Sequence, residues 1–570
     1  MMDKTQQKKS SGVLMHLSSL PSEYGIGSMG APARKFVDFL KKAGQTYWQM
    51  LPICPTSYGD SPYQSFSAYA GNPYFIDLEM LESAGYLEAE DYKTVDWESA
   101  PDHVNYGALY QKRYPILRKA VRRFQETASD DYKAFCRKND YWLHDYASFM
   151  ALKAASGGKA WMDWEPALRN REQKALEHAE VAYKEEIEFW KSLQYLFFEQ
   201  WKTLREYANE AGLQIIGDLP IYVSLDSVDV WAHPELFQLD ENKVPREVAG
   251  CPPDGFSADG QLWGNPLFDW DYMKQNGYQW WTARIGYLCK VYDMLRIDHF
   301  RGFDSYFAIP YGDANAKRGY WKQGPGMDLF RAVEQQIGAQ NIMAEDLGYM
   351  TESVKKLLAD SGFPGIKLLQ FAFDSRDGGG ASYFPEDYPP NCVAYVGTHD
   401  NDTAVGWTTS AEPEDVKRAY LFSCYCGLRL SDVYALRWKD IILDGEQYRM
   451  STVMKKTVTP IYLPLSRHAV RWLPERNGEG DELKIFDGLP AEPNINKVLA
   501  KWVETAKIAK KITYHTSRHT FATMMLTLGA DLYTVSKLLG HANVKTTQIY
   551  AKIVDSKKVE AVNLVDSVFD

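Results

Sequence analysis

Carboxylates follow four apolar, strand-like runs in this chain of 570 residues: Asp218, Asp298, Glu345 and Asp400. Glycosidic-bond chemistry needs two such groups, because one carboxylate acts as a nucleophile while another protonates the leaving oxygen. Arg296 lies two residues before Asp298 and therefore on the same face of a strand, where its charge favours the ionised carboxylate. The pattern predicts an acid site that acts on sugars.

Aromatic and histidine residues accompany these acids. Tyr63, Phe256 and Trp263 are candidates for stacking on sugar rings, and His299 and His399 stand next to Asp298 and Asp400 in the sequence. The alternative is that strand-end acids cap helices and that the aromatic rings belong to the core. For any one of these residues taken alone, the structural explanation is favoured.

The elements that position the acids alternate between strands and helices, which favours a parallel sheet. A (β/α)₈ barrel collects its active site at the carboxyl ends of its strands, although a doubly wound sheet would also do so. Helices are expected over Ala33–Ala43, Tyr183–Asn209 and Thr351–Ala359. The expected strands are Gly12–Leu17, Tyr47–Pro52, Gln214–Asp218, Met294–Asp298, Ile342–Glu345, Gly365–Phe373 and Val393–His399.

Six stretches, in order, resemble the 4-α-glucanotransferases, the amylomaltases or disproportionating enzymes with an α-amylase-like barrel. The similarity runs from about Gly12 to Trp407. It rests on Leu51–Asp77, Gly217–Val223, Cys251–Pro266, Arg296–Gly302, Ala344–Gly348 and Gly397–Asn401. The resemblance implies an α/β fold, a (β/α)₈-type barrel with inserted helical subdomains.

The same resemblance implies a retaining transfer of α-1,4-glucan segments without a metal or an organic cofactor. Asp298 would form the covalent intermediate, Glu345 would act as acid and then base, and Asp400 would stabilise the transition state. Cys251–Pro266 would be a flexible loop over the acceptor side, in which Gly255 replaces a larger aromatic residue of many relatives. The predicted substrate-binding residues are Tyr63, Asp218, Asp254, Phe256, Trp263, Asn265, Arg296, His299 and His399.

The last 155 residues differ in charge and composition. Residues 416–570 hold 23 Lys and Arg against 16 Asp and Glu, a net +7, whereas the preceding part carries −18 and 14 of the 17 tryptophans. A mostly helical domain is expected, with a hairpin of Met450–Val453 and Val458–Leu463. Its helices are predicted at Val416–Trp438, Asn494–Ala509, Arg518–Leu528 and Leu532–Leu539.

The polar residues of this second block suit phosphate chemistry. Arginines and histidines can neutralise one phosphate, and a tyrosine that has lost its proton can attack it. A basic helical face with ordinary buried histidines is the alternative, and it is favoured for any one of them alone. The candidates are Arg429, Lys456, His515, Arg518, His541 and Tyr550.

Together their contexts resemble the catalytic domain of the tyrosine recombinases, the phage-type integrases, over about Val416–Phe569. The resemblance makes Tyr550 the nucleophile that forms a 3′-phosphotyrosyl bond. Lys456 would protonate the leaving 5′-oxygen, although Lys455 beside it also fits. The remaining four residues would bind the phosphate, and no metal is implied.

The domain boundaries follow from these matches. We predict a polar tail at 1–11, a barrel at 12–410, a junction at 411–415 and a recombinase catalytic domain at 416–570. Because only seven strands precede the junction, the barrel lacks its last strand and keeps two unpaired edges.

Three functions are therefore weighed: an α-glucan transferase, a DNA recombinase, and an inactive chimera of two truncated enzymes. The expected partners are maltooligosaccharides and, for the second block, DNA; no oligomeric state is predicted. The chain has no apolar run of about 18–20 residues and its first residues lack a hydrophobic stretch, so neither a membrane span nor a secretory signal is expected. Seven scattered cysteines fit a reducing compartment, the cytoplasm.

Overall fold

The computed structural model divides the chain into two compact units. The first comprises Met1–Leu368 and Glu386–Thr398, and the second Leu369–Pro385 and His399–Asp570. The residues that the structure describes are 9–57, 59–98, 100, 102–254, 257–348, 350–373, 383, 385–401, 403, 415–445, 447–455, 460–474, 476, 480–486, 489, 492–505, 510–541 and 543–551. Most of the predicted junction lies outside these residues, and its boundaries stay a prediction.

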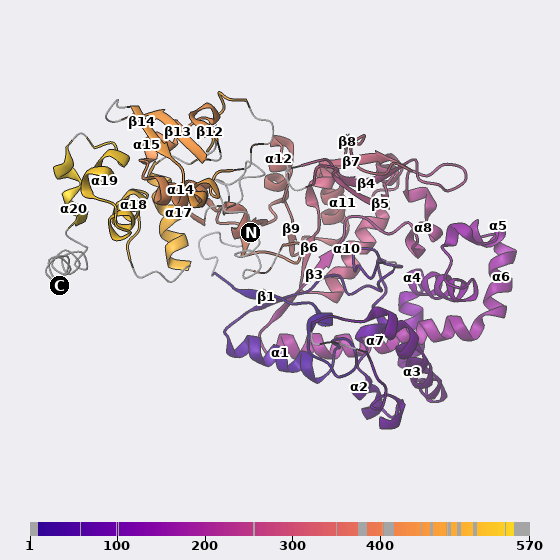
Figure 1. Ribbon diagram of the computed structural model, residues 1–570. Helices are drawn as coiled ribbons and strands as arrows, with labels where there is room; N and C mark the ends of the chain where they lie inside the picture. Colours follow the sequence, from indigo (N-terminus) through magenta and orange to yellow (C-terminus); the bar gives the residue numbers. More distant parts are fainter. Residues whose placement is uncertain are drawn as a thin grey trace. The chain divides into compact units, whose positions relative to one another are not determined.

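Parallel strands form the centre of the first unit, and they neighbour one another in the order in which they occur in the sequence. A five-stranded sheet comprises, in order, β1 (Gly12–Leu14), β2 (Tyr47–Gln49), β3 (Gln214–Leu219), β6 (Met294–Ile297) and β9 (Ile342–Ala344). Figure 1 labels β3, β6 and β9 of this sheet next to one another. A separate parallel pair comprises β10 (Gly365–Leu368) and β11 (Cys392–Tyr395). All seven predicted strands are confirmed. Four of the predictions are too long at their C-terminal ends, however, because β1 ends at Leu14, β2 at Gln49, β10 at Leu368 and β11 at Tyr395. After β10, Leu369–Phe373 turns into a 3₁₀ helix.

The strand pair β10–β11 is connected to the rest of the barrel by hydrogen bonds. The Ala344 amide donates to the Pro364 carbonyl at 2.9 Å, which links the end of β9 to the start of β10. Tyr395 Oη on β11 donates to Gln49 Oε1 on β2 at 2.6 Å. Within the described residues, no strand ladder joins β11 to β1. The contact between β2 and β11, the second and the seventh of the parallel strands, is made by the side chains of Gln49 and Tyr395.

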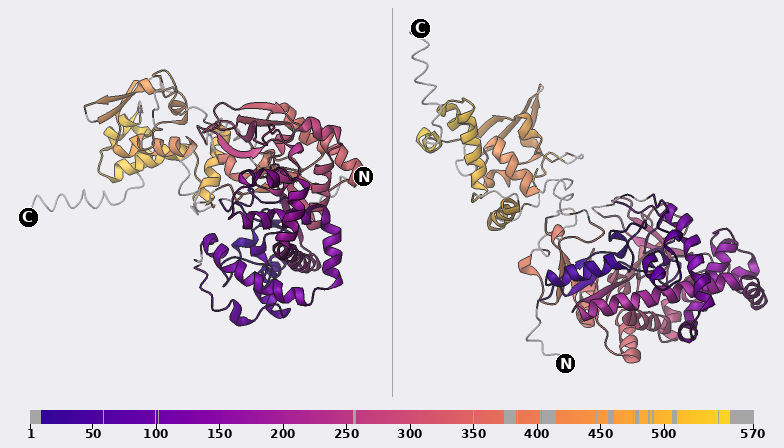
Figure 2. Two further views of the ribbon diagram at one scale, coloured as in Figure 1. Left: turned by 90° about the vertical axis from the view of Figure 1, so that its right-hand side faces the viewer. Right: turned by 90° about the horizontal axis from the view of Figure 1, so that it is seen from below.

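Helices surround these strands. The predicted helices are confirmed as α1 (Ala31–Lys42), α7 (Lys184–Glu210) and α12 (Glu352–Ser361). The long helices between residues 106 and 210, drawn in purple, lie together in Figure 1 and in both views of Figure 2. The other helices of the unit are α2 (Leu78–Ser83), α3 (Tyr106–Glu126), α4 (Asp130–Ala155), α5 (Pro166–Arg169), α6 (Gln173–Ala182), α8 (Val228–Ala232), α9 (Trp270–Gln275), α10 (Gln279–Val291) and α11 (Met327–Ile337).

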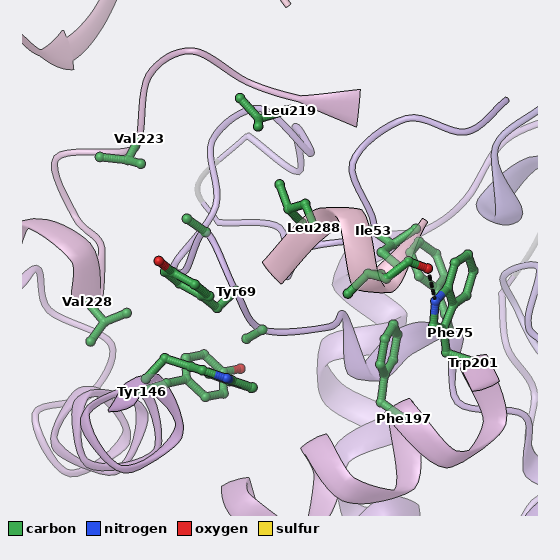
Figure 3. Packing of buried hydrophobic residues seen from close by; sticks show 14 of the residues in the cluster. Ile53, Tyr69, Phe75, Tyr146, Phe197, Trp201, Leu219, Val223, Val228 and Leu288 are labelled. Carbon is green, nitrogen blue, oxygen red and sulfur yellow. Dashed lines mark hydrogen bonds between the residues drawn. The ribbon is translucent and has the colours of Figure 1, made fainter. Parts of the chain in front are cut away.

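One hydrophobic core joins the inserted helices to the barrel. Figure 3 shows Ile53, Phe75, Phe197 and Trp201 gathered in it. The Trp201 indole nitrogen donates to the Val291 carbonyl at 3.0 Å, so its polar atom is satisfied in the core. This continuous core holds the helical insertion and the strands as one body.

A second, antiparallel sheet was not predicted from the sequence. Its strands run in the order β5 (Gln261–Pro266), β4 (Glu247–Cys251), β7 (Ser305–Pro310) and β8 (Tyr320–Gln323). The expectation that all of Cys251–Pro266 is a flexible loop is therefore wrong, because its second half pairs with β4. The chain between β4 and β5 includes Gly255 and Phe256, which lie outside the described residues.

The second unit contains helices around a small antiparallel sheet. The predicted hairpin is confirmed as β13 (Gln447–Val453) and β14 (Pro460–Pro464), and β12 (Ile441–Asp444) adds a strand. The predicted helix Val416–Trp438 is wrong as one piece. It breaks after α14 (Asp415–Cys426), because Gly427 has a φ of +72°, and α15 (Leu430–Val433) follows.

The later helices of this unit agree with prediction to within a few residues. They are α17 (Glu492–Thr505), α18 (His515–Thr527) and α19 (Leu532–Leu538), and the unit also contains α16 (Arg467–Val470) and α20 (Gln548–Ala551). None of the helices in the described part of the chain combines the length and the apolar character needed to cross a membrane.

Candidate active sites

Strand register brings the acids of the first unit together. Asp218 near the end of β3 is paired in register with Arg296 on β6. Asp298 directly follows β6, and Glu345 directly follows β9, whose Ala344 pairs with Ile297. Because these strands are parallel, their carboxyl ends lie at one edge, as in a barrel active site.

Arg296 connects two of these acids. Its Nη1 atom lies 2.6 Å from Asp218 Oδ2 and 2.9 Å from Asp298 Oδ1. The Arg296 and Asp218 side chains are 2% and 0% exposed, whereas the Asp298 side chain is 24% exposed. Burial works against the charge of Arg296, but Asp218 and Asp298 raise its pKa above the ordinary value. The guanidinium thus holds a positive charge beside Asp298, the more exposed of its two acid partners.

Glu345 lies in a different environment. Its two oxygens accept hydrogen bonds from the amides of His299 and Leu347, both at 2.8 Å. Burial raises its pKa to about 7, Arg296 lowers it, and the charge of Asp298 acts in the same direction as burial. A carboxyl group with such a pKa carries its proton over much of the neutral range, as a general acid requires.

The backbone at His299 makes one of these hydrogen bonds. His299 has a φ of +48°, a left-handed conformation that is uncommon for a residue with a side chain. Its buried ring packs edge-on against Trp263, with the centroids 4.9 Å apart. Burial lowers the pKa of His299 to about 3, with the charge of Arg301 in support, so the ring is neutral at physiological pH.

Aromatic and amide side chains border the acids. Tyr63 Oη donates to Asp218 Oδ2 at 2.7 Å. Gln64 Nε2 donates to Asn265 Oδ1 at 3.1 Å and to the Trp263 carbonyl at 3.3 Å. Asn265 in turn donates to the Val223 carbonyl at 2.8 Å. These bonds fix the β5 segment that carries two predicted substrate-binding residues.

The second unit contains a cluster of different character. Arg518 is buried, and it donates through Nη1 to the Gly427 carbonyl at 2.6 Å and through Nη2 to the Leu539 carbonyl. Burial lowers the pKa of Arg518 to about 10, and the charge of Arg429 acts in the same direction. Arg429 Nη1 is buried and has no hydrogen-bond partner among the described residues. The unpartnered N–H groups suit an anionic oxygen.

Tyr550 belongs to the same cluster. It is 4% exposed, burial raises its pKa, and the charges of Arg518 and Arg429 oppose that shift. His541 Nδ1 lies 2.8 Å from Thr547 Oγ1, and burial, Arg518 and Arg429 lower its pKa to about 4. The five candidate residues that the structure describes here are Arg429, His515, Arg518, His541 and Tyr550, because Lys456 lies outside the described residues.

Comparison with known proteins assigns the larger part of the chain. The profile of the 4-alpha-glucanotransferase family matches residues 15–440. A 4-alpha-glucanotransferase of Clostridium butyricum is 47% identical over 413 residues, which is 72% of this chain and 84% of the relative. The chain belongs to the 4-α-glucanotransferase family. One from Streptococcus pneumoniae is 49% identical over 417 residues, 73% of this chain and 82% of the relative.

A solved structure supports the 4-α-glucanotransferase fold. An amylomaltase from Streptococcus agalactiae, determined in complex with acarbose, matches with a TM-score of 0.69 and 45% identity, covering 71% of this chain and 82% of that chain. The phage integrase family profile matches residues 407–557, so the two family matches overlap over residues 407–440. The C-terminal segment is thus similar to phage integrases.

The predicted site residues of the 4-α-glucanotransferase part do not all lie in one place. Most of them meet in the acid cluster or on its β5 border. Asp254 instead accepts a hydrogen bond from the Ser257 amide at 2.7 Å in its own loop. His399 and Asp400 lie in the second unit, where His399 Nε2 is 3.4 Å from Asp400 Oδ1. Phe256 is outside the described residues.

Three polar groups near the cluster were missed by sequence reasoning. The charges of Arg296 and Asp218 act on the Tyr395 hydroxyl group, which donates a hydrogen bond to Gln49 Oε1. Strand alternation could have found Tyr395, because it shares a face of β11 with Val393. The Leu347 and His299 amides carry no side-chain signature, so the sequence could not reveal that they bind Glu345.

Proposed function

We propose that the first unit is a retaining 4-α-glucanotransferase that uses Asp298 and Glu345. The observation that carries this proposal is the contrast between the two acids. Asp298 is partly exposed beside the Arg296 guanidinium, whereas Glu345 is buried with a pKa raised to about 7. A nucleophilic carboxylate and a protonated acid at adjacent strand ends are the pair that double displacement needs.

The first step would transfer the donor glucan to the protein. A carboxylate oxygen of Asp298 attacks the anomeric carbon, and the bond from that carbon to the glycosidic oxygen breaks. Glu345 gives its proton to this oxygen, which leaves as a free 4-hydroxyl group. Asp298 then carries a β-linked glucosyl ester, and Glu345 is a carboxylate whose charge the His299 and Leu347 amides stabilise.

The second step would reverse these roles. The Glu345 carboxylate takes the proton from the 4-hydroxyl group of an acceptor glucan, and the acceptor oxygen attacks the anomeric carbon. The ester bond to Asp298 breaks, and the α-1,4 linkage is restored with the original configuration. Tyr63, Asp218 and Trp263 would bind the donor. The expected parts of His399 and Asp400 in holding its hydroxyl groups rest on their motif.

Maltotriose disproportionation tests the proposal. The purified, folded chain should convert maltotriose into glucose and longer maltooligosaccharides, and Asp298→Asn should lower the rate by about 10⁴-fold or more. Asp360→Asn on α12 is the matched control, because it makes the same change on an exposed helix face. Absence of transfer by folded wild-type protein, or undiminished transfer by Asp298→Asn, would overturn the proposal.

A second candidate activity, DNA strand transfer, is supported by the cluster in the second unit. Tyr550 would attack a DNA phosphorus and release the 5′-oxygen, which Lys456 would protonate, while Arg429 and Arg518 hold the phosphate. The unpartnered Arg429 Nη1 beside buried Arg518 favours this candidate.

A suicide DNA substrate tests this second activity. The chain should form a covalent DNA adduct that is lost in Tyr550→Phe and kept in Tyr533→Phe, an exposed tyrosine on α19. If wild type and Tyr550→Phe give the same gel, the recombinase activity is refuted. If the maltotriose assay is negative as well, the inactive chimera is the correct description.

A further inference from the structure

A cavity of about 380 Å³ opens in the first unit among residues that the acid cluster does not use. It lies between α4, α8, α9 and α10, and its volume falls within the range of about 300–1,000 Å³ typical of small-molecule sites. Its aromatic lining comprises Tyr69, Tyr141, Trp142, Tyr272 and Trp280. We call this cavity the aromatic pocket.

Rings of the aromatic pocket pack against one another, and two of its tyrosines are exposed to solvent. Tyr69 stacks on Trp142, with centroids 6.2 Å apart and an interplanar angle of 14°, and Tyr141 meets Tyr69 edge-on at 5.9 Å. Tyr69 and Trp142 are buried, whereas Tyr141 and Tyr272 are 57% and 40% exposed. The packed rings are therefore supported from behind by the core and accessible from the mouth.

One polar atom in this lining lacks a partner. Asn276 Oδ1 is buried and accepts no hydrogen bond within the described part of the chain. A buried acceptor without a donor costs free energy of about 1–3 kcal/mol, so it is uncommon in a native protein. A ligand hydroxyl group in the pocket would supply the missing donor.

Each acid around the aromatic pocket has a basic neighbour, an arginine for two of them and a histidine for the third. Asp145 lies 2.7 Å from Arg171, and Glu235 lies 3.4 Å from His233. Buried Asp229 accepts from the Ala68 amide at 2.8 Å and has Arg284 as its electrostatic neighbour. An aromatic cage with unopposed acids would favour an ammonium group. This paired arrangement favours a neutral, hydroxyl-rich ligand instead.

We propose that the aromatic pocket binds glucose units of an α-glucan chain, apart from the acid cluster. The aromatic faces would cover the apolar face of a sugar ring, and Asn276 together with the paired carboxylates would accept from its hydroxyl groups. This inference rests on the proposed transferase only in the choice of α-glucan as the ligand. A long glucan would gain affinity from this second contact, whereas maltotriose would not.

Calorimetric titration with maltoheptaose tests the proposal in a chain that cannot turn it over, Asp298→Asn. Two sites per chain are expected. Adding Tyr141→Ala or Trp280→Ala should weaken one of them about three- to tenfold, the loss of one aromatic contact. Phe39→Ala removes an equally exposed ring from α1 and serves as the control. Tyr141→Ala keeps the test decisive if Trp280→Ala does not fold.

Kinetics give an independent readout. In the otherwise unmodified chain, both pocket variants should raise KM for amylose about three- to tenfold with kcat unchanged, and should leave maltotriose turnover unaltered. If both variants bind and turn over long glucans as Phe39→Ala does, the inference is wrong. Saturation of the pocket by choline, with maltoheptaose excluded, would assign an ammonium ligand and also overturn it. Failure of the transferase proposal is seen separately, as absence of products from maltotriose.

Discussion

The two clusters differ in how the positive charges of their arginines are compensated. In the first unit, the Arg296 guanidinium contacts both Asp218 and Asp298, so its charge is matched by acids. In the second unit, burial and the charge of Arg429 lower the pKa of Arg518, and Arg429 Nη1 has no partner among the described residues. A cluster whose cation is already paired with acids suits a neutral substrate, because the guanidinium needs no anion from the ligand. A cationic cluster suits an anion that supplies the missing charge.

Removing the acid function of Glu345 should have the largest effect on the first cluster. Glu345→Gln cannot protonate a glycosidic oxygen, so we expect transfer from maltotriose to fall by about 10²–10⁴-fold. With α-maltosyl fluoride, whose leaving group needs no proton, formation of the glycosyl intermediate should be largely kept. A rapid fluoride-release measurement compares the two donors. Equal losses on both donors would contradict the role of Glu345 as the acid.

The pH profile checks the same residue without a substitution. The pKa of Glu345 is raised to about 7, so its protonated fraction is high below that pH and falls above it. Glycosylation by the wild-type chain should therefore decline about tenfold per pH unit well above pH 7. Fluoride release from α-maltosyl fluoride should not show this decline.

Substituting the arginines should change the free energy of unfolding of the two units by different amounts. Arg296→Met leaves Asp218 buried without its cation, and we expect the free energy of unfolding of the first unit to fall by about 3–5 kcal/mol. Arg429→Met removes a cation whose Nη1 has no partner among the described residues, so the second unit should change by less than about 1 kcal/mol or become more stable. Calorimetry of the full chain measures both transitions, with exposed Arg331→Met as a control. Equal destabilisation by Arg296→Met and Arg429→Met would remove the contrast.

Inorganic phosphate should have the smallest effect. At about ten times its dissociation constant, it should stabilise the second unit by about 1.4 kcal/mol and leave the first unit unchanged. Arg429→Met should cancel that shift. Chloride at equal ionic strength is the control, and an equal rise in both transitions would indicate general salting-out rather than a phosphate site.

The sequence predicted those residues of the site whose positions follow the two-residue alternation of a strand or the end of a strand. Asp218, Arg296 and Asp298 could be placed together because each strand ends abruptly in a polar residue and alternation puts Arg296 on the face of Asp298. The sheet of β4, β5, β7 and β8 was missed, because its strands carry no regular alternation and residues 267–304 separate β5 from β7.

Other features depend on contacts between distant segments. The pKa of Glu345 follows from burial and from the charges of Arg296 and Asp298, and a linear sequence gives neither. The break between α14 and α15 could have been anticipated, because Gly427 is the residue type that ends helices in a left-handed conformation. The helical spacing of apolar residues on both sides of Gly427 does not keep the helix continuous through this glycine.

The amide of His299 links the backbone of Asp298 to the side chain of Glu345 through a single peptide group. The amide that donates to Glu345 Oε2 is bonded to the carbonyl carbon of Asp298 itself. Since a peptide group is planar and stiff, this hydrogen bond ties the Glu345 carboxyl group to the main chain at Asp298. Acid spacing decides whether a carbohydrate enzyme retains or inverts configuration. If Asp298 and Glu345 act as proposed, one peptide group takes part in placing both the nucleophile and the acid.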